Sequence, residues 1–212
     1  MRQALQDNGC DPSGMEAAAV CSVVPQRTAG FQLALASFAS SVITLDHTTP
    51  TGMRLDYQPP ESLGPDRIAN ALGAYELYGG PCLVVDMGTA TTWDVVSADG
   101  VFLGGAIAPG LGTAADSLFA KTARLRPPVW QAPLQVLGKS TEQCLLSGTA
   151  LGYAGMVDFL VNRLSSEAGP FVKVVATGGM ARLVSEMASS VDVVRPSLTL
   201  EGLRVAYLRA QA

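Results

Sequence analysis

The stretch Val84-Val85-Asp86-Met87-Gly88-Thr89-Ala90-Thr91-Thr92 joins an apolar strand, an acidic residue, a turn of glycine and hydroxyl residues, and a second β-rich run. This order predicts a hairpin that handles phosphate, because glycine lets a phosphate approach the backbone and successive N–H and hydroxyl groups can donate to its oxygens. The Asp86 carboxylate can hold a cation that offsets the phosphate charge. The hairpin is not a Walker loop, since a strand rather than a helix follows it. On turn preferences alone, the segment is equally an ordinary hairpin.

The elements around this hairpin predict the fold class. Strands are expected over 82–86, 91–97 and 101–108, joined by tight turns, with a helix after the Pro109–Gly112 loop and a longer one from Ser140 to about 165. A strand over 171–176, a helix over 180–189, a strand over 192–195 and a helix over 200–209 complete the chain. The order βββ-α-α-β-α-β-α is that of a ribonuclease-H-like lobe, which actin-like ATPases and sugar kinases use twice.

The first 79 residues read as the back half of the same pattern. A strand over 17–24, a helix over 28–40, a strand over 42–45, a loop-like segment over 46–63 and a helix over 65–78 give β-α-β-α without three opening strands. We therefore predict an α/β fold of two lobes, a truncated first lobe over 1–79 and a second lobe over 80–212.

Composition narrows the class of protein. The 212 residues are 48% hydrophobic and 15% charged, which predicts a large buried core and argues against disorder. The net charge of −4 and the lack of a basic run argue against a nucleic-acid surface. We expect no secretory leader and no membrane span, because no window approaches eighteen uninterrupted apolar residues.

Cysteine and histidine usage points to a reducing compartment and to no metal cluster. The four cysteines, Cys10, Cys21, Cys82 and Cys144, form no C-x-x-C pair, so reduced thiols in the cytoplasm are expected. The one histidine, His47, lies in a polar loop and is expected to be solvated rather than catalytic.

A second candidate motif, Gly64-Pro65-Asp66-Arg67, stands at a helix start. Asp66 can accept a proton from a hydroxyl, and the planar fork of Arg67 can bind a carboxylate or a phosphate. The alternative is an acidic residue that the helix dipole favours in a first turn.

Three further segments place glycine or hydroxyl residues at element junctions. The run Gly104–Gly112 allows close ligand approach or serves as a tight connection. Gly138-Lys139-Ser140-Thr141 can grip an anion at a helix N-terminus or act as an ordinary cap. Ala176-Thr177-Gly178-Gly179 follows a strand, where a sugar-kinase-like lobe holds adenosine. Together the segments predict a nucleotide-binding lobe with a nearby acid–base pair and a loop for a small substrate.

At this point the chain resembles the type III pantothenate kinases of bacteria, over essentially its whole length and with compatible spacing. The stretches that carry the resemblance are Gly64-Pro65-Asp66-Arg67-Ile68-Ala69-Asn70-Ala71, Ala74-Tyr75-Glu76, Val84 to Thr92, Gly104 to Gly110, Ser22-Val23-Val24-Pro25, Gly138 to Thr141, Ala176 to Gly179, and Leu198 to Leu203.

The resemblance implies a reaction and a set of roles. The reaction is ATP-dependent phosphorylation of pantothenate to 4′-phosphopantothenate, the first step of coenzyme A synthesis, with a divalent metal such as Mg²⁺. Asp66 is similar to the general base that takes the proton of the pantothenate hydroxyl. The implied pantothenate contacts are Tyr57, Gly64, Pro65, Asp66, Arg67 and Thr141. The implied ATP contacts are Gly88, Thr89, Thr177, Gly178 and Gly179.

The resemblance also implies a monovalent cation and a subunit arrangement. Asp86 is similar to the ligand of K⁺ or NH₄⁺. The family works as a homodimer with substrate sites near the subunit interface, so a dimer is implied for this chain, with no nucleic-acid or membrane partner.

Two departures from the family pattern stand out. The usual Gly-Ala-Asp-Arg reads Gly-Pro-Asp-Arg here, a change that fits the first turn of a helix. Family members begin with a strand that carries Asp-x-Gly-Asn-Thr, the first phosphate loop, and that motif does not occur in this sequence. We expect the first lobe to keep only two short strands, which leaves a sheet edge exposed.

Two other functions compete with the kinase. A non-catalytic relative resembling the Bvg accessory factors shares the sequence pattern, but an inactive binder has no need to keep Asp66, Arg67, Asp86 and Thr89 together. A sugar or acetate kinase of the same superfamily is the third option, and the segment from Gly64 to Asn70 argues against it.

Because the first phosphate loop is not in the sequence, we predict that the chain as written binds ATP poorly and has little or no kinase activity. Turnover of pantothenate is to be compared with and without an added amino-terminal Asp-x-Gly-Asn-Thr segment. Equal rates would contradict the prediction.

Overall fold

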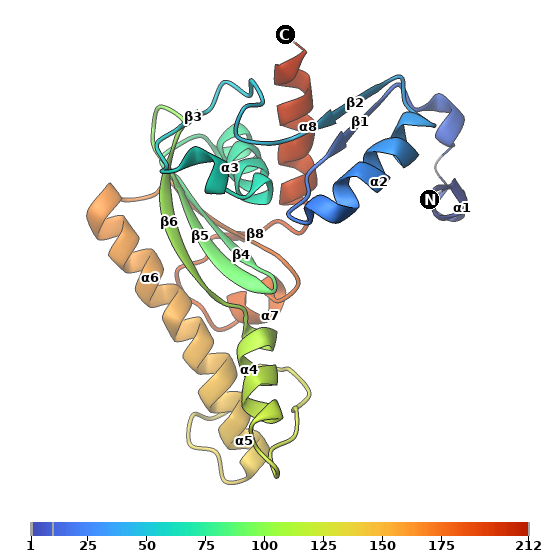
Figure 1. Cartoon of the computed structure of the whole chain (residues 1–212). Coiled ribbons are helices and arrows are strands. Elements are labelled where there is room, and N and C mark those ends of the chain that lie inside the picture. The colour runs from blue at the N-terminus through green and yellow to red at the C-terminus, as the bar shows by residue number, and fades with distance from the viewer. Residues whose placement is uncertain (1, 10, 212) are drawn as a thin grey trace.

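The computed structural model describes residues 2–9 and 11–211, so Cys10 lies outside the described residues. Its main body is a six-stranded sheet with helices on both faces (Figure 1). In spatial order the strands are β3 (Arg54–Leu55), β6 (Val101–Pro109), β5 (Ala90–Val96), β4 (Cys82–Met87), β7 (Lys173–Thr177) and β8 (Val193–Val194).

The strand directions confirm the predicted fold class. β5 runs antiparallel to β4 and β6, whereas the β3–β6, β4–β7 and β7–β8 pairs are parallel. Strands β4, β5 and β6 form a meander, and β7 and β8 add in parallel on the other side of β4. This is the ribonuclease-H-like arrangement. The helices that follow the meander connect parallel strands, as such crossovers require.

Alternation along the strands sends side chains into two hydrophobic clusters, one on each face of the sheet. Cys82 and Val84 face α3 (Pro65–Tyr78) and α8 (Leu198–Ala210). Leu83, Val85 and Met87 face the opposite layer, which contains α4 (Leu111–Ala120), α6 (Gly152–Ala168) and α7 (Ala181–Ser185). Buried strands with apolar residues on both faces are expected in a sheet covered on both sides.

The amino-terminal part forms a separate small sheet. β1 (Ala17–Val20) and β2 (Ser41–Thr44) pair in parallel, with α2 (Pro25–Ala36) between them in sequence and α1 (Arg2–Asp7) ahead of them. β1 contacts α8, and α3 packs within the core of the six-stranded sheet. The division into lobes at residue 79 stays a prediction.

Several boundaries differ from those predicted, and proline chemistry accounts for two of them. The strand predicted over 17–24 ends at Val20, and the next helix begins at Pro25, because proline is favoured at the first helical position. The segment predicted as a loop over 46–63 contains β3 and a 3₁₀ turn, Pro60–Ser62. The elements predicted over 180–189 and 192–195 are the shorter α7 and β8.

The long helix predicted from Ser140 is present. It comprises α5 (Thr141–Leu146), a π-helical segment (Ser147–Leu151) and α6, and the Ser140 side chain accepts a hydrogen bond from the Gln143 backbone N–H, as a cap should. Over Thr141–Ala168 this helix has the length and apolar composition of a membrane span, but part of it packs on the sheet. Core helices of soluble proteins can have the same length and apolar composition.

α3 and α8 pack unusually close because glycine lies at their contact. A Cβ atom at Gly202 would lie 1.7 Å from the Ala69 carbonyl oxygen, and one at Gly73 would lie 2.9 Å from the Leu198 carbonyl oxygen. A side chain at either position would push the helices apart.

We predict that Gly202→Ala destabilises the fold by about 3 kcal/mol, because the added methyl overlaps the backbone of α3. The matched control is Gly155→Ala on α6, where a Cβ meets nothing within 4 Å and alanine should stabilise the helix by about 0.5–1 kcal/mol. Denaturant unfolding of both variants measures the difference. Equal stability of the two variants would contradict the proposed helix contact.

Candidate active site

The first two turns of α3 bring three polar side chains to the sheet. Pro65 occupies the first helical position after Gly64, which caps the helix with an extended backbone. Asp66, Arg67 and Asn70 follow, and residues three and four apart share one face of a helix. Arg67 and Asn70 are buried, whereas Asp66 is half-buried.

Gly64 leaves room for the Asp66 carboxylate. A Cβ atom at Gly64 would lie 2.5 Å from Asp66 Oδ1. That oxygen accepts a hydrogen bond from the Arg67 backbone N–H at 2.9 Å, so the carboxylate folds back over the start of the helix. The conformation suits an acid at a helix N-terminus, where the dipole favours negative charge.

The sheet face under α3 carries a row of polar side chains. Asp86 pairs in register with Thr92 of β5 on one side and with Thr177 of β7 on the other. Because directly opposed residues point to the same face, these three side chains lie side by side. Asp94, two residues beyond Thr92, also points to this face.

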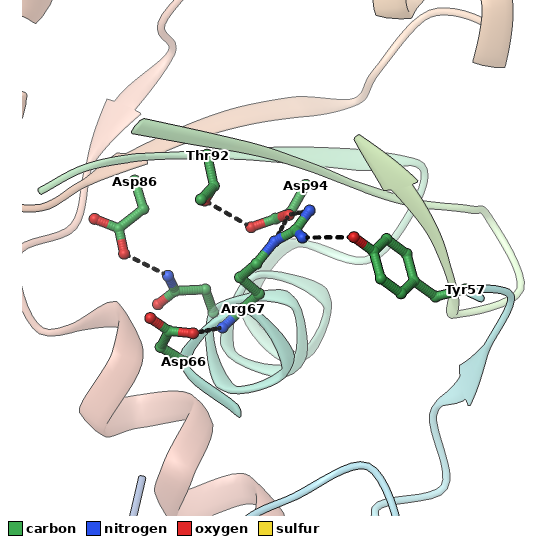
Figure 2. A network of polar contacts seen from close by, with 7 residues as sticks. Tyr57, Asp66, Arg67, Asp86, Thr92 and Asp94 are labelled. Atoms are coloured by element: carbon green, nitrogen blue, oxygen red, sulfur yellow. Dashed lines mark hydrogen bonds and ion pairs between the residues drawn. The ribbon is translucent and has the colours of Figure 1, made fainter. Parts of the chain in front are cut away.

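Arg67 and Asp94 form a buried ion pair between α3 and β5 (Figure 2). Arg67 Nε and Nη2 lie 2.7 and 2.6 Å from Asp94 Oδ1, and the side chains are 7% and 0% exposed. Thr92 Oγ1 donates to Asp94 Oδ2 at 3.0 Å. Burial raises the pKa of Asp94 to about 6, while Arg67 and Thr92 act to lower it, so the carboxylate is ionised at neutral pH.

Two aromatic rings cover the Arg67 guanidinium. Its Cζ lies 5.4 Å from the centre of the Tyr57 ring and 5.5 Å from that of Phe102. Nη1 also donates to Tyr57 Oη at 3.3 Å. Arg67 was predicted to bind a carboxylate or a phosphate through its planar fork, and in this structure Asp94 and Tyr57 engage part of that fork.

Asp86 is held through Asn70, which connects it to the carboxyl-terminal helix. Asn70 Nδ2 donates to Asp86 Oδ2 at 2.8 Å, and Thr199 Oγ1 donates to Asn70 Oδ1 at 2.7 Å. Burial raises the pKa of Asp86, the Asn70 hydrogen bond lowers it, and the nearby charge of Asp66 raises it. Figure 2 places the two carboxylates on the same side of the network.

The predicted phosphate hairpin meets two other loops beside Asp86. Gly110 N–H donates to the Thr89 carbonyl at 2.9 Å, and Thr113 Oγ1 donates to the same oxygen at 2.7 Å. A Cβ at Gly178 would lie 2.6 Å from Asp86 Oδ1, and one at Gly110 would lie 2.0 Å from the Gly88 carbonyl oxygen. Gly88, Thr89, Thr177 and Gly178 are thus brought together, and Gly179 follows directly in the chain.

This arrangement fits a cation and a phosphate chain. The half-buried Asp86 carboxylate has a raised pKa because burial disfavours its charge, and a cation would restore the charge balance. The glycines at 88, 110 and 178 keep the surrounding backbone free of side chains. No cluster of three His, Cys, Asp or Glu side chains suited to a metal occurs in the part of the chain that is described.

The amino-terminal sheet also approaches the site. Burial and, to a smaller extent, the charge of Asp66 raise the pKa of the Cys21 thiol to about 12. Cys21 therefore stays protonated at neutral pH and is not a nucleophile. Among the described residues Cys21, Cys82 and Cys144 are free thiols, as predicted.

Thr141 is not brought to this site within one chain. It begins α5, at the opposite end of the molecule from α3 (Figure 1). Sequence reasoning also missed four residues of the network: Asp94, Asn70, Thr199 and Phe102. An acidic residue inside the apolar run 90–96 was the one available signal for Asp94.

The fold is ribonuclease-H-like, and it places the Gly88–Thr89 turn directly after Asp86, with the Asp66 carboxylate on the same side of the network. The family model of type III pantothenate kinases matches residues 1–163. A type III pantothenate kinase of Roseiflexus sp. (strain RS-1) is 46% identical over 200 residues, covering 94% of this chain and 78% of that protein. The corresponding protein of Moorella thermoacetica is 40% identical over 210 residues, covering 99% and 83%.

This chain therefore belongs to the family of type III pantothenate kinases. A solved structure titled as a Baf family transcriptional activator from Campylobacter jejuni has the same fold, with a TM-score of 0.62 at 21% identity, covering 93% of this chain and 84% of that one. A likeness at that identity indicates fold and not activity.

We predict opposite shifts of the Asp86 pKa in two variants. Asn70→Leu removes the hydrogen bond to the carboxylate and should raise the pKa, whereas Asp66→Asn removes a like charge and should lower it. Carboxyl ¹³C titration by NMR measures both shifts, with Asp99→Asn in the exposed β5–β6 turn as a control outside the network. Shifts of the same sign in the two variants would contradict the assigned network.

Proposed function

We propose that this chain transfers the γ-phosphoryl group of ATP to the primary hydroxyl of pantothenate, giving 4′-phosphopantothenate. The observation that carries the proposal is the placement of Asp66 and Asp86 on one side of a single network, with the glycine-lined hairpin directly after Asp86. Membership of the family supplies the substrate.

Asp66 acts as the general base that receives the hydroxyl proton. It is half-buried and anchored through one oxygen to the Arg67 backbone N–H, which leaves its other oxygen available to a substrate. Gly64 and Pro65 set the start of the helix that orients it. Positioning of the hydroxyl by Asp66 matters because phosphoryl transfer depends mainly on geometry and charge neutralisation.

The nucleotide binds across the loops beside Asp86. Gly88 and Thr89 contact the phosphates, and the Thr177-Gly178-Gly179 turn contacts the adenosine. Asp86 holds K⁺ or NH₄⁺, and Mg²⁺ accompanies ATP; when bound, these cations neutralise charge that develops on the transferred group. Tyr57 and Arg67 form the other wall of the site and contact pantothenate.

A homodimer accounts for the position of Thr141. Because α5 and α3 lie at opposite ends of one chain, Thr141 can reach a pantothenate site only in a second copy. Large exposed apolar side chains on β6, α6 and the segment between α4 and α5 offer a surface for that copy: Leu103, Ile107, Val129, Leu134, Val136, Leu137 and Phe159. We infer that the enzyme works as a dimer in the cytoplasm.

We predict that Asp66→Asn lowers pantothenate-dependent ADP release by about 10²–10⁴-fold, because the hydroxyl loses its proton acceptor. The matched control is Asp99→Asn in the exposed β5–β6 turn, which should keep the parent rate. Both are assayed in this chain and in the chain with an added Asp-x-Gly-Asn-Thr segment. An active Asp66→Asn enzyme would overturn the assigned base, and a parent protein that releases ADP only with another alcohol would overturn the substrate.

A further inference from the structure

Asp94 is a fully buried acid that no motif assigns to the reaction. We propose that Asp94 is a positioning residue: it fixes the Arg67 guanidinium so that the remaining Arg67 N–H groups recognise the carboxylate of pantothenate. The inference rests on the proposed function. It adds a residue that influences substrate specificity without contacting the substrate.

A count of donors supports this role. A guanidinium has five N–H donors and no acceptor. Nε donates one N–H to Asp94 Oδ1, Nη2 lies 2.6 Å from the same oxygen in the ion pair, and Nη1 donates one N–H to Tyr57 Oη, so one N–H on Nη1 and at least one on Nη2 remain for a ligand. Arginine binds carboxylates through two parallel N–H bonds, so the two remaining donors match what a substrate carboxylate needs.

The geometry around the pair holds Arg67 in one orientation. The Tyr57 and Phe102 rings lie within 5.5 Å of Cζ and are themselves in edge contact, with centroids 5.9 Å apart. Asp94 engages the Nε edge, so the guanidinium cannot turn about the Cδ–Nε bond without breaking that contact. Thr92 Oγ1 in turn holds the second oxygen of Asp94.

The charge balance also requires Asp94. Arg67 is buried, and burial opposes its charge, but the Asp94 carboxylate raises its pKa, so the guanidinium stays charged. Without Asp94, Arg67 would be an unpaired buried cation and would be driven to another orientation. Asp94 contacts neither proposed reacting group, and its effect on the reaction must pass through Arg67.

The first test compares the KM for pantothenate with the KM for ATP. Asp94→Asn keeps the size of the side chain but removes its charge, and in the chain with the added Asp-x-Gly-Asn-Thr segment we expect the pantothenate KM to rise about tenfold. The KM for ATP and the kcat should change by less than about threefold, because the hairpin and Asp66 are untouched. The control is Asp158→Asn on α6, which packs on the opposite face of the sheet from α3; there, among the described residues, the carboxylate accepts hydrogen bonds only from Ser189 and Ser190.

An equal rise of the KM for both substrates, or no rise of either KM, would overturn the proposal. In the Arg67→Lys background, Asp94→Asn should add little further loss for pantothenate, because Asp94 acts through the guanidinium. Full additivity of the two changes would equally overturn it. If Asp94→Asn fails to fold, Thr92→Val, which releases only Asp94 Oδ2, should shift the pantothenate KM in the same direction by a smaller factor.

The second test needs no turnover and separates this proposal from the proposed function. The Arg67 Nε–H signal is identified in ¹⁵N NMR by its absence from Arg67→Lys. In the parent protein it should exchange slowly with solvent, and in Asp94→Asn it should exchange at least about tenfold faster, because a charge-assisted hydrogen bond is replaced by a neutral one. An unchanged rate overturns the positioning role, whereas a parent protein that does not turn over pantothenate even with the added Asp-x-Gly-Asn-Thr segment overturns the proposed function alone.

Discussion

The buried contact between Arg67 and Asp94 is the interaction on which the arrangement of the site depends. It joins the first turn of α3 to the middle of β5, and it lies under two aromatic rings. An ion pair with side chains 7% and 0% exposed loses much of its hydration, so its net contribution to stability is small or negative. What such a pair supplies is a fixed orientation, since each partner is costly to leave alone.

The same turn of α3 places Asp66, the next turn places Asn70, and alternation along the strands places the remaining polar side chains of the site. Because Asp86 stands in register with both Thr92 and Thr177, three adjacent strands deliver polar side chains to one face at one level. A shift of one residue in either pairing would send Asp86 or its neighbours into the apolar layer under α6. The site is therefore a consequence of sheet register as much as of any motif.

Much of this could be predicted from the sequence where the signals are local. The meander from Cys82 to Pro109 and the helix Pro65–Tyr78 follow from apolar runs, tight turns and a proline at the first helical position. β3 has two residues and pairs only through the distant β6, so no local pattern marks it. Thr199 lies 129 residues from Asn70, and a single side-chain hydrogen bond over that separation leaves no trace in sequence periodicity.

The close packing of α3 on α8 explains why the carboxyl-terminal helix matters to a site built mainly around residues 57–94. Gly202 lets the two backbones touch, and Thr199, three residues earlier on α8, then reaches Asn70. Asn70 can donate to Asp86 in a defined orientation because its own oxygen is already engaged. A wider helix spacing would break the Thr199 contact first and free the Asn70 amide to turn. Asp86, the proposed cation ligand, would then lose the one described hydrogen bond that orients it, so the glycine at 202 contributes to the electrostatics of a site it does not touch.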